Sequence, residues 1–287
     1  MLKTWIGAGA AILITGCVLA EGAARLSGAT SVPLYVKDSV DQYRPAANQH
    51  GALWRRNDWV YNDRGMGVGP PFQPIGSLVI GDSETEGSVS FMKQADKIGP
   101  LLQKDTGDEV WPLGAKGWGL ANELGWLNAH SEVFALKRIM ILSNRGDFGP
   151  AHAWDDEIAH PTHRPLLATA YLVRKAFYKP DPTTDDPLPS PESTRSWHDA
   201  LHRFLTSYQG QVVFIELPIE SDVINHRDGF APLNDELKVE GRANLYVIRV
   251  ADDPTWNAGL YHNEFHPSPA GNRELAAFIA HHLPALN

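Results

Sequence analysis

The residues best suited to chemistry are a serine and a histidine that lie far apart in the chain. Ser83 follows an apolar run at 78–80 and the pair Gly81-Asp82, and His266 lies close to the C-terminus. A serine hydroxyl is a weak nucleophile until a neighbouring base removes its proton, and imidazole is the most common base. If folding brings the two side chains together, they could break or form an ester. If it does not, Ser83 is most simply a helix cap and His266 a surface residue.

The elements that must position these residues are short apolar runs that alternate with helical patterns. The runs are too continuous for half-exposed strands and suit strands buried on both faces of a parallel sheet. The predicted strands are 78–80, 110–113, 139–142, 212–217 and 245–250. Helical patterns follow at 93–105, from Leu120 to Leu127, and at 164–179, 197–208 and 269–283. This alternation predicts an α/β fold of three layers, α/β/α, with a five-stranded parallel sheet of the flavodoxin-like type and an N-terminal hydrophobic helix.

Two further loops at the same sheet edge carry residues that could bind a developing negative charge. Ligands of such sheets bind at the carboxyl ends of the strands, where Ser83 and His266 are both expected. Gly117 follows the second strand, and a glycine there lets a backbone N–H point at a ligand oxygen. Asn144 follows the third strand and could add a side-chain donor. A plain strand-to-helix turn is the alternative for the glycine.

These loops, in this order, resemble the motifs of the SGNH (GDSL-type) hydrolase superfamily of membrane-anchored bacterial type. Gly81-Asp-Ser83 is similar to the first motif, 112–119 to the second, and His266-Pro to the last. The resemblance covers roughly 77–287. It implies that Ser83 is the nucleophile, that His266 is the general base, and that the N–H groups of Ser83 and Gly117, with Asn144, form the oxyanion hole. It implies no metal and no cofactor.

The sequence departs from this family pattern at two positions. The third motif reads Asn144-Arg-Gly-Asp147 in place of Gly-x-Asn-Asp, and Asn263 stands where the family has an aspartate three residues before the histidine. Asparagine can accept a hydrogen bond from imidazole but brings no charge, and in the serine-protease template this change costs on the order of 10⁴ in turnover. A Ser–His dyad or another carboxylate could compensate. The candidate carboxylates are Glu264, Asp252 and Asp253.

Composition limits the class of protein. The 287 residues carry a net charge of -9 with no basic block, which argues against a nucleic-acid partner. Cys17 is the single cysteine, so the chain can form neither an internal disulfide nor a cysteine-based zinc site. We expect a domain at 75–287, preceded by an irregular connecting arm at 27–74 and a separate segment at 1–26.

The N-terminal segment is an uncharged apolar stretch from Thr4 to Ala20, preceded by Lys3 and followed by Glu21. It is long enough to suggest a signal-anchor helix in an inner membrane. The sequence before Cys17 also resembles a lipoprotein processing site, and the apolar stretch could equally be a cleaved secretion signal. Each alternative places the domain outside the cytoplasm, in the periplasm or the extracellular space.

The sequence thus predicts a membrane-tethered serine esterase or acyltransferase acting on an O-acyl ester, for example an O-acetylated envelope glycan. Trp118, Trp126 and Trp154 could stack on sugar, or they could belong to the core. The alternative is a catalytically impaired domain of the same fold that binds an envelope glycan or a protein partner, which Asn263 favours. A cytosolic flavodoxin-like domain that cradles phosphate is the third interpretation.

Overall fold

The computed structural model describes residues 2–179 and 195–285 and contains the predicted parallel sheet. Its five strands are arranged in the order β6-β5-β7-β8-β9, with every neighbouring pair parallel. The strands are β5 (Ser77–Gly81), β6 (Val110–Gly114), β7 (Arg138–Ser143), β8 (Gln211–Glu216) and β9 (Leu245–Arg249). The five predicted strands and the flavodoxin-like order are therefore confirmed.

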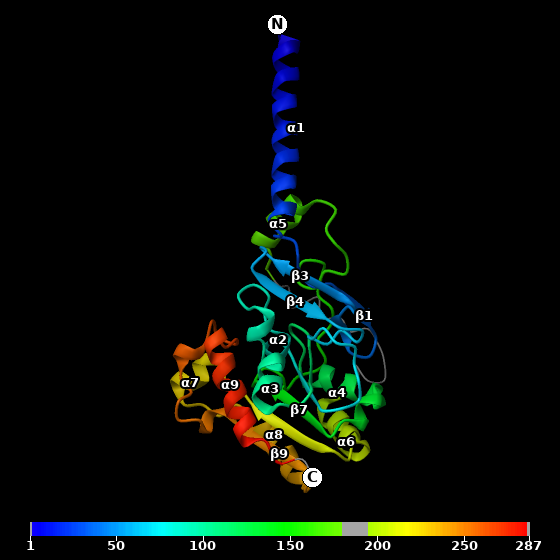
Figure 1. Ribbon diagram of the computed structural model, residues 1–287, viewed down its shortest axis with the longest axis vertical. Coiled ribbons are helices and arrows are strands. Elements are labelled where there is room, and N and C mark those ends of the chain that lie inside the picture. The colour runs from blue at the N-terminus through cyan, green and yellow to red at the C-terminus, as the bar shows by residue number, and fades with distance from the viewer. Residues whose placement is uncertain (1, 180–194, 286–287) are drawn as a thin grey trace.

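Helices cover both faces of the sheet, as Figure 1 shows. On one face lie α3 (Ile98–Thr106) and α9 (Pro269–His282). On the other lie α4 (Leu120–Ala129), α6 (Trp197–Ser207) and α8 (Ala231–Glu240). In β5, Val79 joins the core under α3 and α9, whereas Leu78 and Ile80 join the opposite core. Burial on both faces explains why this strand has no alternating pattern in the sequence.

Three helices complete the described part of the sheet domain. The predicted helix at 164–179 forms as the shorter α5 (Ala168–Ala176). A helix beginning next to Asp82 was expected and forms as the single turn α2 (Ser83–Glu86). The helix α7 (Glu220–Asn225) is too short for a recognisable helical period, and neither it nor α8 was predicted.

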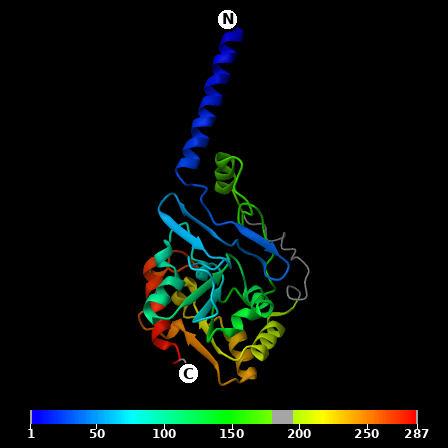
Figure 2. The same ribbon diagram turned by 45° about the vertical axis from the view of Figure 1, so that its right-hand side comes forward.

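The segment 27–74 is more regular than the predicted connecting arm. It contains two antiparallel hairpins. Their strands are β1 (Tyr35–Asp38), β2 (Gln42–Pro45), β3 (Gln49–Leu53) and β4 (Asn57–Tyr61). Figures 1 and 2 both place the hairpins between the N-terminal helix and the sheet. The strands have only four or five residues and mix buried polar with apolar side chains, which is why the sequence pattern did not reveal them.

The N-terminal helix α1 (Leu2–Leu26) projects away from the rest of the molecule (Figures 1 and 2). At its base, the Glu21 carboxylate accepts hydrogen bonds from the backbone N–H groups of Ala168 and Thr169 at the start of α5. These bonds lower the pKa of Glu21 to about 2. The sequence did not predict this contact with the rest of the molecule, because 1–26 was interpreted as a separate segment.

The predicted membrane anchor is not supported. Within 2–179 and 195–285, no helix combines the length and the apolar character needed to cross a membrane. The prolines and aspartates of 180–191 predict an exposed loop, and this segment lies outside the described residues.

The close approach of β6 to the turn after β5 requires a glycine, which gives a first testable prediction. A Cβ on Gly114 would lie 2.5 Å from the Asp82 carbonyl oxygen and 2.7 Å from the Glu86 nitrogen. Gly114→Ala should therefore destabilise the fold by about 1–3 kcal/mol, as overpacking does elsewhere. Urea unfolding measures this change.

Gly69→Ala is the matched control, because nothing lies within 4 Å of a Cβ there and its backbone needs no positive φ. Equal stability of the two variants would contradict the close packing described for Gly114.

Candidate active site

The end of β5 delivers Ser83 to the carboxyl edge of the sheet. The strand stops at Gly81, and Asp82 caps the single turn of α2 by accepting a hydrogen bond from the Glu84 N–H, at 3.0 Å. Ser83 is the first residue of that turn and is half-buried. The capping role considered for this pair is therefore filled by Asp82, and the Ser83 hydroxyl is left for other contacts.

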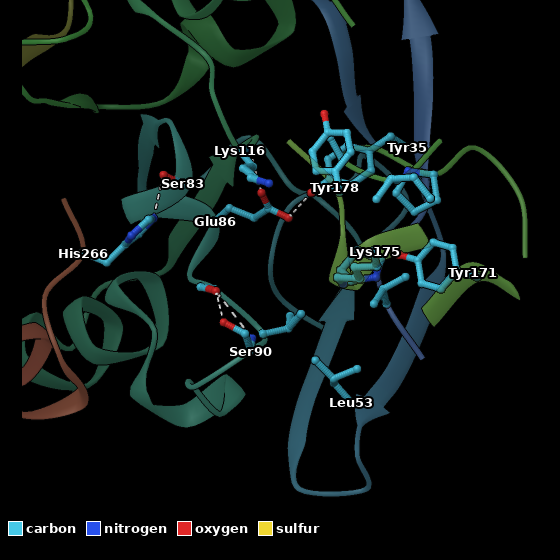
Figure 3. Close-up of a pocket in the computed structure, with 17 residues that line it drawn as sticks. Tyr35, Leu53, Ser83, Glu86, Ser90, Lys116, Tyr171, Lys175, Tyr178 and His266 are labelled. Carbon is cyan, nitrogen blue, oxygen red and sulfur yellow. Dashed lines mark hydrogen bonds between the residues drawn. The ribbon is translucent and has the colours of Figure 1, made fainter. Parts of the chain in front are cut away.

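The structure brings Ser83 and His266 into direct contact. His266 Nε2 lies 2.9 Å from Ser83 Oγ, although the two residues are 183 positions apart (Figure 3). The loop that carries His266 is closed by a bridge between Tyr261 and Pro267, and α9 begins directly after it. Pro267 and Pro269 stiffen this connection. The predicted nucleophile–base pair thus has the geometry that proton transfer requires.

Asn263 contacts the ring nitrogen of His266 that faces away from Ser83. Its Oδ1 lies 2.9 Å from His266 Nδ1 and also accepts a hydrogen bond from the His266 backbone N–H, at 3.0 Å. Because an amide oxygen only accepts, Nδ1 carries the proton and Nε2 has a free lone pair directed at Ser83. Asn263 is exposed to solvent and holds the imidazole in the tautomer of a general base without adding charge. The other carboxylates considered for this role make no recorded contact with His266.

Three predicted oxyanion-hole residues line one cavity of about 390 Å³, which also contains His266. They are Ser83, Gly117 and Asn144. Gly117 has a positive φ of 82°, a conformation that favours glycine, and no acceptor is found for its N–H within the described residues. The Asn144 side chain is engaged elsewhere, because its Nδ2 lies 3.3 Å from Asp82 Oδ2 and 3.4 Å from Glu84 Oε1.

A second cavity, of about 330 Å³, adjoins the first at Ser83, Lys116 and His266. Figure 3 shows that it runs from the Ser83–His266 pair toward Tyr171 and Lys175 of α5. Aromatic and aliphatic side chains from the hairpins and the α5 region form most of its wall. They include Val32, Tyr35, Leu53, Ile158, Tyr171 and Tyr178. Ser83 therefore stands where two cavities meet.

Glu86 connects the hairpins to the loops that carry Ser83 and Lys116. Its Oε1 accepts hydrogen bonds from the hydroxyl groups of Tyr35, at 2.6 Å, and Tyr61, at 2.9 Å. Its Oε2 accepts one from the Lys116 backbone N–H, at 2.7 Å. One carboxyl group thus fixes β1, β4 and the loop after β6 relative to α2.

Buried carboxyl groups surround the base of the site. Asp82, Glu84, Glu123 and Asp147 are each less than 10% exposed. Burial, together with the charge of Asp82, raises the pKa values of Glu84, Glu123 and Asp147 well above their ordinary range. Despite this grouping, no set of three or more His, Cys, Asp or Glu residues in the described chain is arranged to hold a metal ion.

The tryptophans considered for sugar stacking are mostly part of the core. Trp118 and Trp126 are each 2% exposed, and the Trp118 indole N–H donates to the Tyr43 carbonyl at 2.7 Å. Trp154 is half-buried, and Lys37 Nζ lies 3.2 Å from the centre of its ring. The core interpretation is therefore confirmed for Trp118 and Trp126.

No protein-family model matches this chain, and no curated protein is similar to it in sequence. Solved structures are similar in fold. One is a member of the lipolytic protein G-D-S-L family from Veillonella parvula, with 16% identity, coverage of 73% of this chain and 98% of that one, and a TM-score of 0.44. Another is a family two carbohydrate esterase from Clostridium thermocellum in complex with cellohexaose, with 12% identity, coverage of 75% and 65%, and a TM-score of 0.43.

A third is an acetyl xylan esterase from the rumen bacterium Butyrivibrio proteoclasticus, with 15% identity, coverage of 75% and 65%, and a TM-score of 0.39. The likeness is one of fold. Similarity this distant assigns no activity to the chain, so its chemistry has to be inferred from its own residues.

Sequence reasoning missed several residues of the site. Glu84 directly follows the first motif and Lys116 lies within the second, but neither was assigned a role. Tyr35 was not considered because the segment 27–74 was expected to lie over the surface, and no role was assigned to Glu86, Tyr171 or Tyr178. The available signal for Glu84 was its position, since a carboxylate directly after the nucleophile must lie near the same sheet edge.

The groups around His266 determine the direction in which its pKa is shifted. Burial lowers the pKa of His266 below the ordinary 6.5, Asp82 opposes this, and the cations Lys116 and His262 reinforce it. Lys116→Met should therefore raise the His266 pKa toward its ordinary value. Titration of the imidazole by NMR measures both values.

Lys104→Met is the control for this comparison, because Lys104 is an exposed cation on α3 that does not act on His266. A His266 pKa at or above 6.5 in the unmodified protein would contradict the described environment.

Proposed function

We propose that the protein hydrolyses or transfers O-acyl groups through an acyl-enzyme on Ser83, with His266 as the general base. The observation that carries this proposal is the 2.9 Å contact between Ser83 Oγ and His266 Nε2, with His266 Nδ1 held by Asn263. A hydroxyl paired with an oriented imidazole is the arrangement that activates serine for attack on a carbonyl carbon.

In the first half of the reaction, Ser83 Oγ attacks the ester carbonyl carbon while its proton passes to His266 Nε2. The carbonyl oxygen becomes an oxyanion, for which the N–H groups of Ser83 and Gly117 are the donors. When the tetrahedral intermediate collapses, the carbon–oxygen bond to the alcohol breaks, and the imidazolium gives its proton to the departing alcohol oxygen. The acyl group then remains on Ser83.

In the second half, water or an acceptor hydroxyl attacks the acyl-enzyme and gives its proton to His266. Collapse of the second intermediate returns that proton to Ser83 Oγ and releases the acid or the new ester. Asn263 keeps the Nδ1 proton in place throughout, but it supplies no charge to stabilise the imidazolium. We therefore expect turnover to be slower than with an aspartate at this position.

Asn144 takes part in the proposed oxyanion hole only if its amide leaves Asp82 and Glu84. Its Nδ2 contacts with those carboxyl groups are long, at 3.3 and 3.4 Å, and so are weak hydrogen bonds. A negatively charged oxygen next to Gly117 would compete for the same N–H groups.

The two cavities that meet at Ser83 support an ester with two substantial parts. A volume of about 330 Å³ on one side and about 390 Å³ on the other is sufficient for an acyl chain and a sugar-sized alcohol. We propose an O-acylated glycan, such as an O-acetylated one, as the substrate class to test first. The complex of the Clostridium thermocellum esterase with cellohexaose makes glycans a reasonable first choice.

A binding domain without turnover is the second candidate function, and Asn263 is the observation that favours it. With no charge behind the imidazole, the same cavities could hold an acylated glycan or a protein partner without cleaving it.

We also propose that the domain is located outside the cytoplasm, because the uncharged stretch from Thr4 to Ala20 follows Lys3 as in an export signal. A fusion of residues 1–40 to a phosphatase that is active only after export should be active in a bacterial host. An inactive fusion would contradict this location.

Replacement of Ser83 tests the proposed reaction. The unmodified chain should hydrolyse p-nitrophenyl acetate, and Ser83→Ala should lower its kcat/KM by about 10³-fold or more, because no acyl-enzyme can form. Ser207→Ala, at the exposed end of α6, is the control and should leave the rate unchanged. Turnover that survives in Ser83→Ala would exclude the mechanism, and absence of turnover in the unmodified chain would favour the binding domain.

Replacement of Asn263 tests the role of the missing charge. Asn263→Asp retains the oxygen that accepts from His266 and adds a negative charge behind the imidazole. We expect kcat to rise about 10-fold, less than the template effect because residue 263 is exposed and its charge is screened. The pKa of His266 should rise as well. An unchanged or lower kcat in a folded variant would show that the asparagine does not limit the reaction.

A further inference from the structure

Glu84, the residue after the nucleophile, has its carboxyl group in contact with the nucleophile. Glu84 Oε2 lies 3.1 Å from Ser83 Oγ, and Glu84 Oε1 lies 3.4 Å from Asn144 Nδ2. The side chain is only 4% exposed. Nothing in the reaction described above uses this group, although it lies within hydrogen-bond distance of the attacking oxygen.

The protonation state of Glu84 matters because Ser83 Oγ has a single proton to donate. The hydroxyl has one proton, and two groups that can accept it lie within reach: His266 Nε2 at 2.9 Å and Glu84 Oε2 at 3.1 Å. If Glu84 is ionised, it can only accept, and it competes with His266 for that proton. It would also place a negative charge next to Asn144, a donor of the proposed oxyanion hole.

A neutral Glu84 satisfies its contacts with Ser83 and Asn144 together. Its hydroxyl oxygen, Oε2, donates to a lone pair of Ser83 Oγ, so that the serine proton is directed at His266 Nε2. Its carbonyl oxygen, Oε1, accepts from the Asn144 amide. Each hydrogen bond in this network then has one donor and one acceptor, as a buried network of polar groups requires.

We propose that Glu84 is a positioning residue: its neutral carboxyl group donates a hydrogen bond to Ser83 Oγ and thereby orients the serine proton toward His266. This inference rests on the proposed function, because it assigns a role within the same reaction.

The surroundings of Glu84 favour the neutral form. The side chain is removed from water, and the charged or titratable groups that act on it from neighbouring elements include Asp82 and Asp147. Tyr261, from the loop that carries His266, is another neighbour. Burial first, and the charge of Asp82 second, raise the pKa of Glu84 well above its ordinary range.

Two substitutions separate the proposed role from a merely structural one. Glu84→Gln retains a donor for Ser83 and an acceptor for Asn144, so kcat for p-nitrophenyl acetate should stay within about threefold of the unmodified chain. Glu84→Met has a similar length but no donor, so kcat should fall about 10- to 100-fold with little change in KM, as expected for a misoriented catalytic group. Asp105→Asn, an exposed carboxylate on α3, is the control for loss of charge.

Infrared difference spectroscopy tests the protonation state without turnover. The spectrum of the unmodified chain minus that of Glu84→Gln at neutral pH should contain the carbonyl band of a protonated carboxylic acid. A difference that contains only ionised carboxylate bands would overturn the proposal, whatever the activity of the variants.

The kinetic outcomes also distinguish the two proposals. Ser83-dependent turnover that Glu84→Gln and Glu84→Met reduce equally, or do not reduce at all, would overturn the role of Glu84 and leave the esterase proposal intact. Absence of Ser83-dependent turnover in the unmodified chain would overturn the esterase proposal, and the role of Glu84 in it.

Discussion

The site depends on one constraint, the parallel order of the sheet. Because the strands run in the same direction, the loops after β5, β6 and β7 all open at one edge, and the segment after β9 returns to it. The Ser83–His266 contact joins residues 183 positions apart, and it exists only because α9 is anchored next to α3. Asn272 and Arg273 of α9 donate hydrogen bonds to Asp96 and fix this position.

Acidic side chains hold the walls of the site together and lie buried around its base. Glu86 connects the hairpins to the loops that carry Ser83 and Lys116 through three hydrogen bonds, so the segment before the sheet domain belongs to the wall of the site. Glu84, Glu123 and Asp147 lie deeper, and an ionised carboxylate there would be costly to keep away from water. The balance between neutral and charged carboxyl groups therefore decides how many negative charges surround the nucleophile.

The sequence was sufficient to predict the parts of the molecule that follow from local patterns. Leu78, Val79 and Ile80 are buried on both faces, so their continuous run indicated a central strand. The order of the serine, glycine and histidine loops then predicted which side chains would share one edge. The hairpins were missed because their strands have only four or five residues and mix buried polar with apolar side chains, and residues such as Gln42 adopt a positive φ that no local pattern indicates. The contact between Glu84 and Asn144 could not be predicted, since it depends on the direction in which the Glu84 side chain leaves the single turn of α2.

The most direct test of an activated Ser83 is covalent labelling of the full chain with a fluorophosphonate, followed by peptide mass spectrometry. Such a reagent reacts with a serine whose proton is removed by a neighbouring base. We expect one adduct, on Ser83, and loss of that adduct in His266→Gln. An unlabelled Ser83, or equal labelling of Ser83 when His266 is replaced, would contradict the account of a serine activated across the sheet edge.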